Sequence, residues 1–406
     1  MPEAVIVAAT RSPIGRAVKG SLTDVRPDDL AAAVIRAALD KVPELDPSTV
    51  DDLHLGCAEP HDEHGRNMAR RVSILLGLDD VPATTVIRAC ASSVQTARMA
   101  FHAIKAGEGD VFISAGVECV SRYHGGWLGV ADPAADNALF DSAKERTRQL
   151  AQSNGEWTNP RTVGDLPDAY VAMGQTAENV ANLSKVSRED QDAFAVRSQN
   201  LAEAALARGF FDSEITPITT TGGTVITADD SPRAGVTHDA VAGLKPAFRV
   251  GGTVTAGNSC PLSDGAAATV IMSDTRAREL GITPLARIVA TGVSGLSPEI
   301  MGLGPVEATR RALSRARLTV DDIDLYEINE AFAAQVIASY REIGLDPERL
   351  NVHGGAIALG HPFGSTGARI MGTLINGLAT TDKQFGLETM CVGGGQGMAL
   401  IIERLS

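Results

Sequence analysis

Two nearly identical heptapeptides lie far apart in the chain: T-V-D-D-L-H-L at residues 49–55 and T-V-D-D-I-D-L at residues 319–325, 319 − 49 = 270 positions apart. A strand-like segment and a helical segment precede each copy, and a second helical segment follows it. These predicted elements are a strand over 3–10 with helices over 27–39 and 68–76, and a strand over 285–291 with helices over 306–316 and 331–343. Self-similarity over so long a period indicates one supersecondary unit used twice. Because strands alternate with helices in each copy, we expect two layered α/β halves with mostly parallel strand pairing.

The segment between the two copies, about residues 122–252, has a different character. It holds both tryptophans, Trp127 and Trp157, and proline- and glycine-bearing stretches around a helical part over residues 176–209. Long insertions are usually functional, so we interpret it as a covering lid, with a subunit contact or surface excursion as the alternative. The predicted division is residues 1–121 with 253–273 as the N-terminal half, 122–252 as the inserted loop domain and 274–406 as the C-terminal half.

Composition limits the classes of function. The 406 residues carry 36 basic and 50 acidic side chains, a net charge of −14. This excess of acid argues against a general nucleic-acid or anionic-membrane binder, so an anionic ligand would need local positive groups or helix N-termini. Five widely spread cysteines indicate free thiols in a reducing compartment. With no membrane-length apolar run, no signal peptide pattern at the start and no peroxisomal signal at the end, we expect a soluble cytoplasmic protein.

One cysteine stands at a turn from strand to helix, in V-I-R-A-C-A-S-S-V-Q-T-A-R-M-A at residues 86–100. A β-branched run ends before Cys90, and apolar residues then recur at helical spacing. We expect Ser92 and Ser93 to cap this helix. The positive end of the helix dipole would favour the Cys90 thiolate, as a nucleophile requires. A small buried residue in a βα turn is the alternative.

Three glycine- or asparagine-bearing turns in the second half also contain chemically useful side chains. Asn329 begins N-E-A-F at a turn from strand to helix, where it could cap the helix or hold a water or carbonyl. His361 ends G-G-A-I-A-L-G-H at the position equivalent to Cys90 in the repeat, since 361 − 90 = 271. Cys391 begins C-V-G-G-G-Q-G, whose N–H groups, that of Gly393 included, could form an oxyanion hole. Two thiols and an imidazole supply a nucleophile, a base and a second acid/base.

The run C-A-E-P-H-D-E-H, from Cys57 to His64, resembles metal-ligand spacing. It lies in one loop with no fourth ligand nearby, so we expect a solvated or subunit-contact loop and no metal site.

In order and spacing, these sites resemble the thiolase family, the acetyl-CoA C-acyltransferases, over nearly the whole chain. Further matching segments are Cys90 with Ser92, residues 173–179, L-K-P-A-F at 244–248, T-A-G-N at 255–258 and D-G-A-A at 264–267. The resemblance implies the thiolase fold: two duplicated layered α/β halves with an inserted loop domain.

The resemblance also implies roles for the site residues. Cys90 would accept the acyl group after activation by His361, and Cys391 would move the proton at the α-carbon of acetyl-CoA. Asn329, through a water, and His361 would form the oxyanion hole for the enolate. The N–H groups of Cys90 and Gly393 would form the second hole, for the tetrahedral intermediate.

The resemblance places four more residues at the substrate. Arg233 would lie near the CoA adenine, Met301 beside the acyl pocket, and Met173 and Cys260 near the bound CoA. The chain departs from the family where Cys260 replaces a small residue such as serine and where Ser93 replaces glycine. It also has Ala172 where short-chain biosynthetic members often carry histidine.

The expected function is CoA-dependent cleavage of 3-ketoacyl-CoA to acetyl-CoA and a shortened acyl-CoA, in fatty-acid or related side-chain β-oxidation. The alternatives are an acetoacetyl-CoA thiolase working toward condensation, a ketosynthase on a similar fold, and a non-catalytic acyl-CoA-binding subunit. Coenzyme A is expected as a substrate and no cofactor is expected. The family resemblance implies a homodimer or homotetramer, and it allows a hydratase/dehydrogenase as a partner protein.

Overall fold

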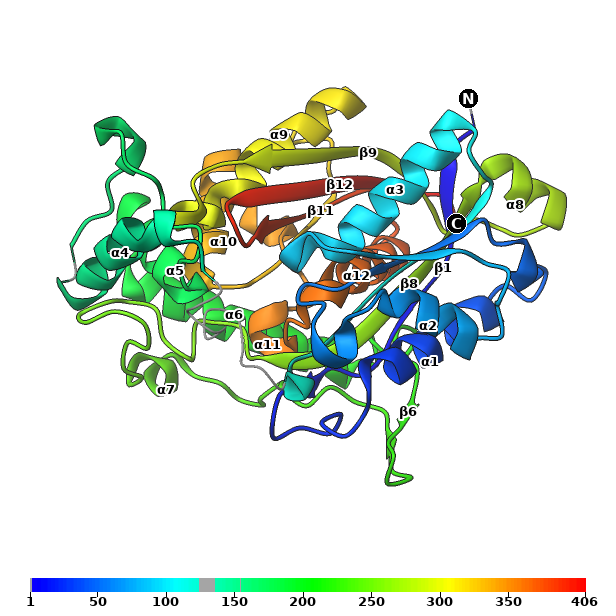
Figure 1. The fold of residues 1–406 in the computed structure, drawn as a ribbon, viewed down its shortest axis with the longest axis horizontal. Coiled ribbons are helices and arrows are strands. Elements are labelled where there is room, and N and C mark those ends of the chain that lie inside the picture. Colours follow the sequence, from blue (N-terminus) through cyan, green and yellow to red (C-terminus); the bar gives the residue numbers. More distant parts are fainter. Residues whose placement is uncertain (1, 124–135, 154) are drawn as a thin grey trace.

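The computed structural model describes residues 2–123, 136–153 and 155–406, so Trp127 lies outside the described residues. Figure 1 shows the elements arranged in layers. The strands are β1 Ala4–Arg11, β2 Gly15–Arg16, β3 Asp52–Gly56, β4 Ala83–Val86, β5 Val111–Cys119, β6 Ile218–Thr219, β7 Val225–Ile226, β8 Ser263–Ser273, β9 Ala286–Gly295, β10 Leu325–Ile328, β11 Phe385–Val392 and β12 Gln396–Arg404. The helices are α1 Pro27–Asp40, α2 Met68–Leu75, α3 Ser92–Ala106, α4 Asp141–Ser153, α5 Met173–Leu183, α6 Arg188–Ala207, α7 His238–Ala242, α8 Asp274–Leu280, α9 Gly304–Ala316, α10 Ala333–Ile343, α11 Ala356–Leu359 and α12 Thr366–Thr380.

The predicted duplication is visible in the main sheet. Its strand order is β10-β11-β12-β9-β1-β8-β5-β3-β4, with β2 paired to β8. From the centre outward, one half reads β1, β8, β5, β3 and the other reads β9, β12, β11, β10. The halves join where β1 pairs with β9 at only two positions, Val5 with Arg287 and Ile6 with Ala286. The two copies therefore lie side by side as one mixed sheet.

The expectation of mostly parallel pairing is wrong. Only the pairs β3–β4, β3–β5 and β10–β11 are parallel, and the other pairs of the main sheet are antiparallel. In the second half, β11 reaches β12 through the short turn 393–395, and a connection this short permits only antiparallel pairing. In the first half, β8 also lies antiparallel beside β5, although a long segment separates these two strands in the sequence.

Side chains on alternate faces of the strands form the three largest apolar clusters of the core. One cluster packs α1 and α2 against the first half-sheet, and another packs α9 and α10 against the second. The cluster between them joins α3 and α12 to strands of both halves, with Val94 and Ile370 among its members. Figure 1 shows α3 and α12 in this central position. Two helices that each follow a site residue are therefore buried against one another.

The segment between β5 and β8 carries α4 to α7, of which α4, α5 and α7 lie at one end of the molecule, whereas the β6–β7 hairpin projects from another part of it (Figure 1). Buried Glu299 of the second half holds it: Arg146 Nη2 donates to Oε1 at 2.9 Å and Trp157 Nε1 to Oε2 at 2.7 Å. The single helical part predicted over 176–209 is two helices, α5 and α6. The break is local, because Lys185 adopts a φ of 52° and Ser187 caps α6. Among the described residues, every helix is too short or too polar to cross a bilayer.

Candidate active site

Cys90 lies in a 3-10 turn, Ala89–Ala91, that immediately precedes α3. The turn is tight, because Ala89 has a φ of 41°. Ser92 closes it: its Oγ accepts the Arg88 N–H at 2.9 Å and donates to the Ala89 carbonyl at 2.7 Å. The predicted position of Cys90, where the helix begins, is therefore confirmed.

The prediction that Ser92 and Ser93 cap α3 is wrong. The N-cap position falls on Ala91, which has no polar side-chain atom, and the helix has no side-chain cap. The two serines lie one and two residues after the N-cap position, so neither can cap the helix. Ser93 turns to the neighbouring helix instead, where its Oγ accepts the Ala368 N–H at 3.0 Å.

Burial decides the protonation of Cys90. It raises the pKa of the thiol to about 11, against the opposing effect of the backbone N–H groups of Gly393 and of Cys90 itself. The expectation that the helix dipole would favour a thiolate is therefore not met in the free protein, because desolvation of the charged form outweighs it. Attack by this sulfur requires a base that removes its proton.

His361 is the predicted base. It is buried, its backbone N–H donates to Ser263 Oγ at 3.2 Å, and its Nδ1 lies 2.7 Å from Thr366 Oγ1. The Thr366 hydroxyl is within 2.9 Å of the Pro362 carbonyl, which can only accept. The hydroxyl therefore donates to the carbonyl and accepts from Nδ1–H, which assigns the in-plane lone pair of the ring to Nε2. Burial lowers the pKa of His361 to about 3, with Arg369 adding to the effect, so the imidazole is neutral.

Asn329 lies at the end of β10 beside this lone pair. Its Nδ2 is 3.2 Å from His361 Nε2, close enough for the amide to donate. Its Oδ1 is buried and has no hydrogen-bond partner among the described residues. That oxygen is available to a water or a substrate group, which fits the pocket role predicted for Asn329 better than the capping role.

Three thiols from different parts of the chain converge at the turn between β11 and β12. Cys391 is fully buried, and burial raises its pKa well above the usual value, with Cys90 and then Cys260 adding to the effect. Burial likewise raises the pKa of Cys260, which Cys90 also raises. Gly393, two residues after Cys391, directs its N–H at the Cys90 thiol. Cys90 and Cys391 therefore meet although they are distant in sequence.

The predicted substrate-binding residues are not all in one place. Met301 is buried in an apolar cluster with Cys391 and Phe332, and Met173 at the start of α5 packs against that cluster. Cys260 donates its backbone N–H to the Ala331 carbonyl at 3.1 Å, next to the same cluster. Arg233 instead has an exposed side chain in the loop between β7 and α7.

Comparison with known proteins agrees with this architecture. Residues 4–275 match the model of the thiolase N-terminal domain, and residues 282–404 match that of the thiolase C-terminal domain. The chain belongs to the thiolase family. The predicted family, the predicted thiolase fold and the assignment as an acyltransferase are thereby confirmed.

The thiolases most similar in sequence cover essentially the whole chain. One is a 3-ketoacyl-CoA thiolase of Bacillus subtilis, 43% identical over 99% of this chain and 100% of its own length. Another is a 3-oxoadipyl-CoA/3-oxo-5,6-dehydrosuberyl-CoA thiolase of Escherichia coli, 43% identical with full coverage of both chains. A solved structure of human mitochondrial 3-ketoacyl-CoA thiolase has a TM-score of 0.86 and 36% identity, covering 100% of this chain and 99% of its own. The Bacillus anthracis acetyl-CoA acetyltransferase has a TM-score of 0.85 and 39% identity, with the same coverage.

Sequence reasoning missed Glu118, which organises the loops around this thiolase site. Its buried carboxylate accepts the N–H of Ala58 at 2.7 Å, the N–H of Gly364 at 2.8 Å and the Tyr123 hydroxyl at 2.8 Å. Gly364 is three residues from His361, so Glu118 fixes the turn that carries His361. The available signal was a carboxylate at the end of an otherwise apolar strand, V-F-I-S-A-G-V-E-C. Thr366 was missed as well, although it stands five residues after His361.

The loop with metal-like spacing has other contacts. Cys57 Sγ lies 3.4 Å from Glu118 Oε1, His61 Nδ1 lies 3.0 Å from Asp62 Oδ2, and His64 Nε2 accepts the Cys119 N–H at 3.0 Å. Within residues 2–123, 136–153 and 155–406, no three His, Cys, Asp or Glu side chains are grouped so as to hold a metal ion.

Proposed function

We propose that this thiolase cleaves 3-ketoacyl-CoA with CoA, through an acyl group carried on Cys90. The observation that carries the proposal is the proximity of Cys90 and Cys391, together with the packing of Cys90 against Phe363, whose ring lies 5.0 Å from that of His361. Cys90, Cys391 and His361 each lie in a turn that ends a strand or begins a helix of the duplicated core, so the three groups are held on rigid elements.

The first half-reaction forms the acyl-enzyme. His361 Nε2 takes the proton of Cys90, and the sulfur attacks the 3-keto carbon, whose oxygen is received by the N–H groups of Cys90 and Gly393. The C2–C3 bond then breaks and an acetyl-CoA enolate leaves. His361, now protonated at Nε2, and Asn329, through a water, stabilise the enolate oxygen. An oxyanion hole of this kind contributes about 3–4 kcal/mol.

The second half-reaction restores the starting protonation states of Cys90, Cys391 and His361. Cys391 protonates the enolate carbon to release acetyl-CoA and becomes a thiolate. That thiolate takes the thiol proton of the incoming CoA, whose sulfur attacks the acyl group on Cys90. The departing Cys90 sulfur recovers its proton from His361. No redox step or metal enters the sequence, and CoA is a substrate rather than a resident cofactor.

The acyl chain is proposed to be that of a fatty-acid or related side-chain 3-ketoacyl-CoA. The apolar cluster of Met301, Phe332, Val254 and Cys391 supports an apolar acyl group, because a carboxylate buried there would lack a partner. Met173, Cys260 and Arg233 are proposed to contact the CoA part. The relatives named for 3-oxoadipyl-CoA make a chain ending in a carboxylate the competing substrate.

A substrate panel tests this proposal. Steady-state rates on C4, C8 and C16 3-ketoacyl-CoA and on 3-oxoadipyl-CoA are expected to favour the C8 and C16 substrates. Preference for C4 would support the acetoacetyl-CoA alternative, and preference for 3-oxoadipyl-CoA would overturn the apolar assignment. Cys90→Ser is expected to abolish cleavage. If Cys90→Ser kept the wild-type rate, the proposal that Cys90 carries the acyl group would be wrong. If the wild type were inactive on all four substrates, the alternative of a non-catalytic acyl-CoA-binding subunit would be favoured.

The assembly is proposed to be a homodimer, or a homotetramer built from such dimers. Strand β4 ends the sheet with its outer edge unpaired among the described residues, and an exposed strand edge is a template for pairing. Large apolar side chains are exposed next to it: Ile87 by 61%, Ile74 by 50% and Leu75 by 49%. Light scattering on the purified chain tests this, and an Ile87→Lys variant is expected to shift the mass toward monomer. The protein is also proposed to be cytoplasmic and to associate with a hydratase/dehydrogenase.

The inserted segment is proposed to be a unit of its own within the first half. The proposed division is residues 1–121 with 253–273, residues 122–252, and residues 274–406. Limited proteolysis is expected to cut within 122–252 first and to leave both halves associated.

A further inference from the structure

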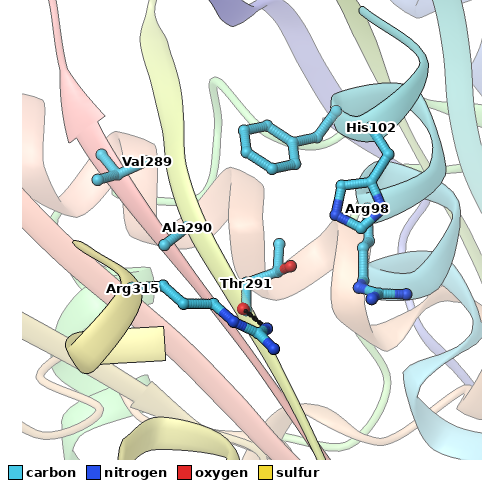
Figure 2. Close-up of a pocket in the computed structure, with 7 residues that line it drawn as sticks. Arg98, His102, Val289, Ala290, Thr291 and Arg315 are labelled. Carbon is cyan, nitrogen blue, oxygen red and sulfur yellow. Dashed lines mark hydrogen bonds between the residues drawn. The ribbon is translucent and has the colours of Figure 1, made fainter. Parts of the chain in front are cut away.

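A second pocket, away from the thiols, lies between α3 and β9. Its volume is about 350 Å³, and guanidinium groups stand on opposite sides of it: Arg98 from α3, which also supplies His102, and Arg315 from α9. Phe101 and residues 289–291 complete the lining. Figure 2 shows Arg315 reaching toward Thr291, with Arg98 and His102 across from it. No carboxylate lines this pocket.

The arginines of the pocket are not neutralised. Arg98 Nε is buried and has no hydrogen-bond partner within the described part of the chain. Arg315 Nη1 donates to the Thr291 carbonyl at 2.6 Å, and nearby Arg88 donates to the neutral amides of Gln95 and Gln396. None of these contacts supplies a negative charge.

The cations also act on one another. Burial lowers the pKa of Arg98, and Arg88 and Arg315 lower it further. Burial lowers the pKa of His102 as well, followed by Arg98 and Arg315. In a chain of net charge −14, these groups form a local patch of positive charge without an acid beside it, and such a patch attracts anions.

We propose that this pocket binds a phosphate group, free or carried by a small phosphomonoester. Guanidinium groups from two directions suit a tetrahedral oxyanion, because each can donate two hydrogen bonds to it. The Phe101 ring, Val289 and Ala290 provide an apolar wall for an attached organic group. The volume is at the lower end of the range for small-molecule sites. The pocket shares no lining residue with the proposed catalytic site.

The test uses the full chain and measures binding by calorimetry and thermal shift at constant ionic strength. The probes are inorganic phosphate and glycerol phosphate, with chloride as the ionic control. Phosphate at tenfold excess over its dissociation constant is expected to raise the melting temperature by roughly 1–3 °C, while chloride does not. Tighter binding of glycerol phosphate would identify a phosphomonoester as the occupant, and equal or weaker binding would identify free phosphate.

Arg98→Gln tests the pocket itself. It is expected to weaken phosphate binding by at least about tenfold and to leave the melting temperature without phosphate no lower, because Arg98 Nε has no partner to lose. Arg36→Gln is the matched control, since Arg36 is an exposed arginine on α1 that donates only to the Leu75 carbonyl, at 3.3 Å. It is expected to bind phosphate as the wild type does.

Three outcomes would overturn the proposal. One is a phosphate response no larger than that of chloride, and another is an unchanged response in Arg98→Gln. The third is dissociation of an oligomer by Arg98→Gln with no phosphate binding by the wild type, which would assign the cations to carboxylates of a second copy.

Discussion

Ser93 of α3 and Ala368 of α12 are joined by a hydrogen bond of 3.0 Å, from the Ala368 N–H to the Ser93 hydroxyl. Ala368 is the third residue of α12, a helix that has no side-chain cap of its own. The first N–H groups of a helix lack intrahelical partners, so Ser93 serves as a cap supplied by the neighbouring helix. The close approach depends on Gly367, where a Cβ would lie only 2.3 Å from Val94 Cγ2. Ser93 therefore links the two halves of the duplication.

Ser93→Ala is expected to lower the free energy of unfolding by about 1–3 kcal/mol, because the buried Ala368 N–H loses its acceptor. Urea denaturation measures the change. Ser314→Ala, at an exposed position of α9, is the matched control and is expected to change it by less than about 0.5 kcal/mol. Equal effects of the two substitutions would show that the Ser93 hydrogen bond contributes nothing.

Thr366→Val is expected to reduce kcat for 3-ketoacyl-CoA cleavage by about ten- to a hundredfold. The substitution keeps the shape of the side chain but removes the oxygen that accepts from His361 Nδ1, and loss of such an orienting partner has effects of this size. Thr366→Ser keeps the hydroxyl and is expected to retain most of the rate. If valine and serine gave the same rate, the assignment of the lone pair to Nε2 would lose its support.

Glu118→Gln is expected to destabilise the protein by about 1–3 kcal/mol and to reduce kcat, since an amide N–H₂ would face N–H donors. The N–H groups of Ala58 and Gly364 share Oε2, which the glutamine oxygen can replace, so the N–H₂ would stand at Oε1 and face the Glu59 N–H, which donates there at 3.3 Å. Tyr123→Phe removes only one donor to the same carboxylate and is expected to have the smaller effect on both quantities. A larger loss in Tyr123→Phe than in Glu118→Gln would place the organising role on the tyrosine.

His361 makes the stability depend on pH. The pKa of its imidazole is lowered to about 3 in the folded protein, whereas the unfolded chain binds a proton below about pH 6.5. Its contribution to stability is therefore complete above pH 6.5 and is lost as the pH falls toward 3. His361→Gln is expected to flatten the fall in unfolding free energy below pH 6.5 by up to about 1.4 kcal/mol per pH unit.

Urea denaturation at pH 7, 6 and 5 compares that variant with the wild type. His238→Gln, at an exposed position of α7, serves as the control because a surface imidazole stays in water in both states. Parallel curves for wild type and His361→Gln would mean that His361 is not held neutral by burial.

The outline of the fold and the places of Cys90, His361 and Cys391 at turns could be predicted because they are encoded in local patterns. The repeated heptapeptide indicated the duplication, and hydrophobic periodicity predicted α1, α2, α9 and α10. The turns at Cys90, His361 and Cys391 lie where strands end or helices begin. Periodicity and turn chemistry act over a few residues, so a chain read in order displays them directly.

The protonation states and the supporting contacts depended on folding. Ser93 is hydrogen-bonded to Ala368, 275 residues away in the sequence, and Glu118 to Gly364, 246 residues away. No local sequence pattern indicates such partners. The raised pKa of Cys90 and the lowered pKa of His361 arise chiefly from burial, which exists only once both halves enclose the site. The uncompensated pocket of Arg98 and Arg315 has the same origin, because α3 and α9 meet β9 only in the folded sheet. Residue types and their spacing therefore suffice to identify the chemistry, whereas solvent exclusion and long-range contacts decide the charge that each group carries.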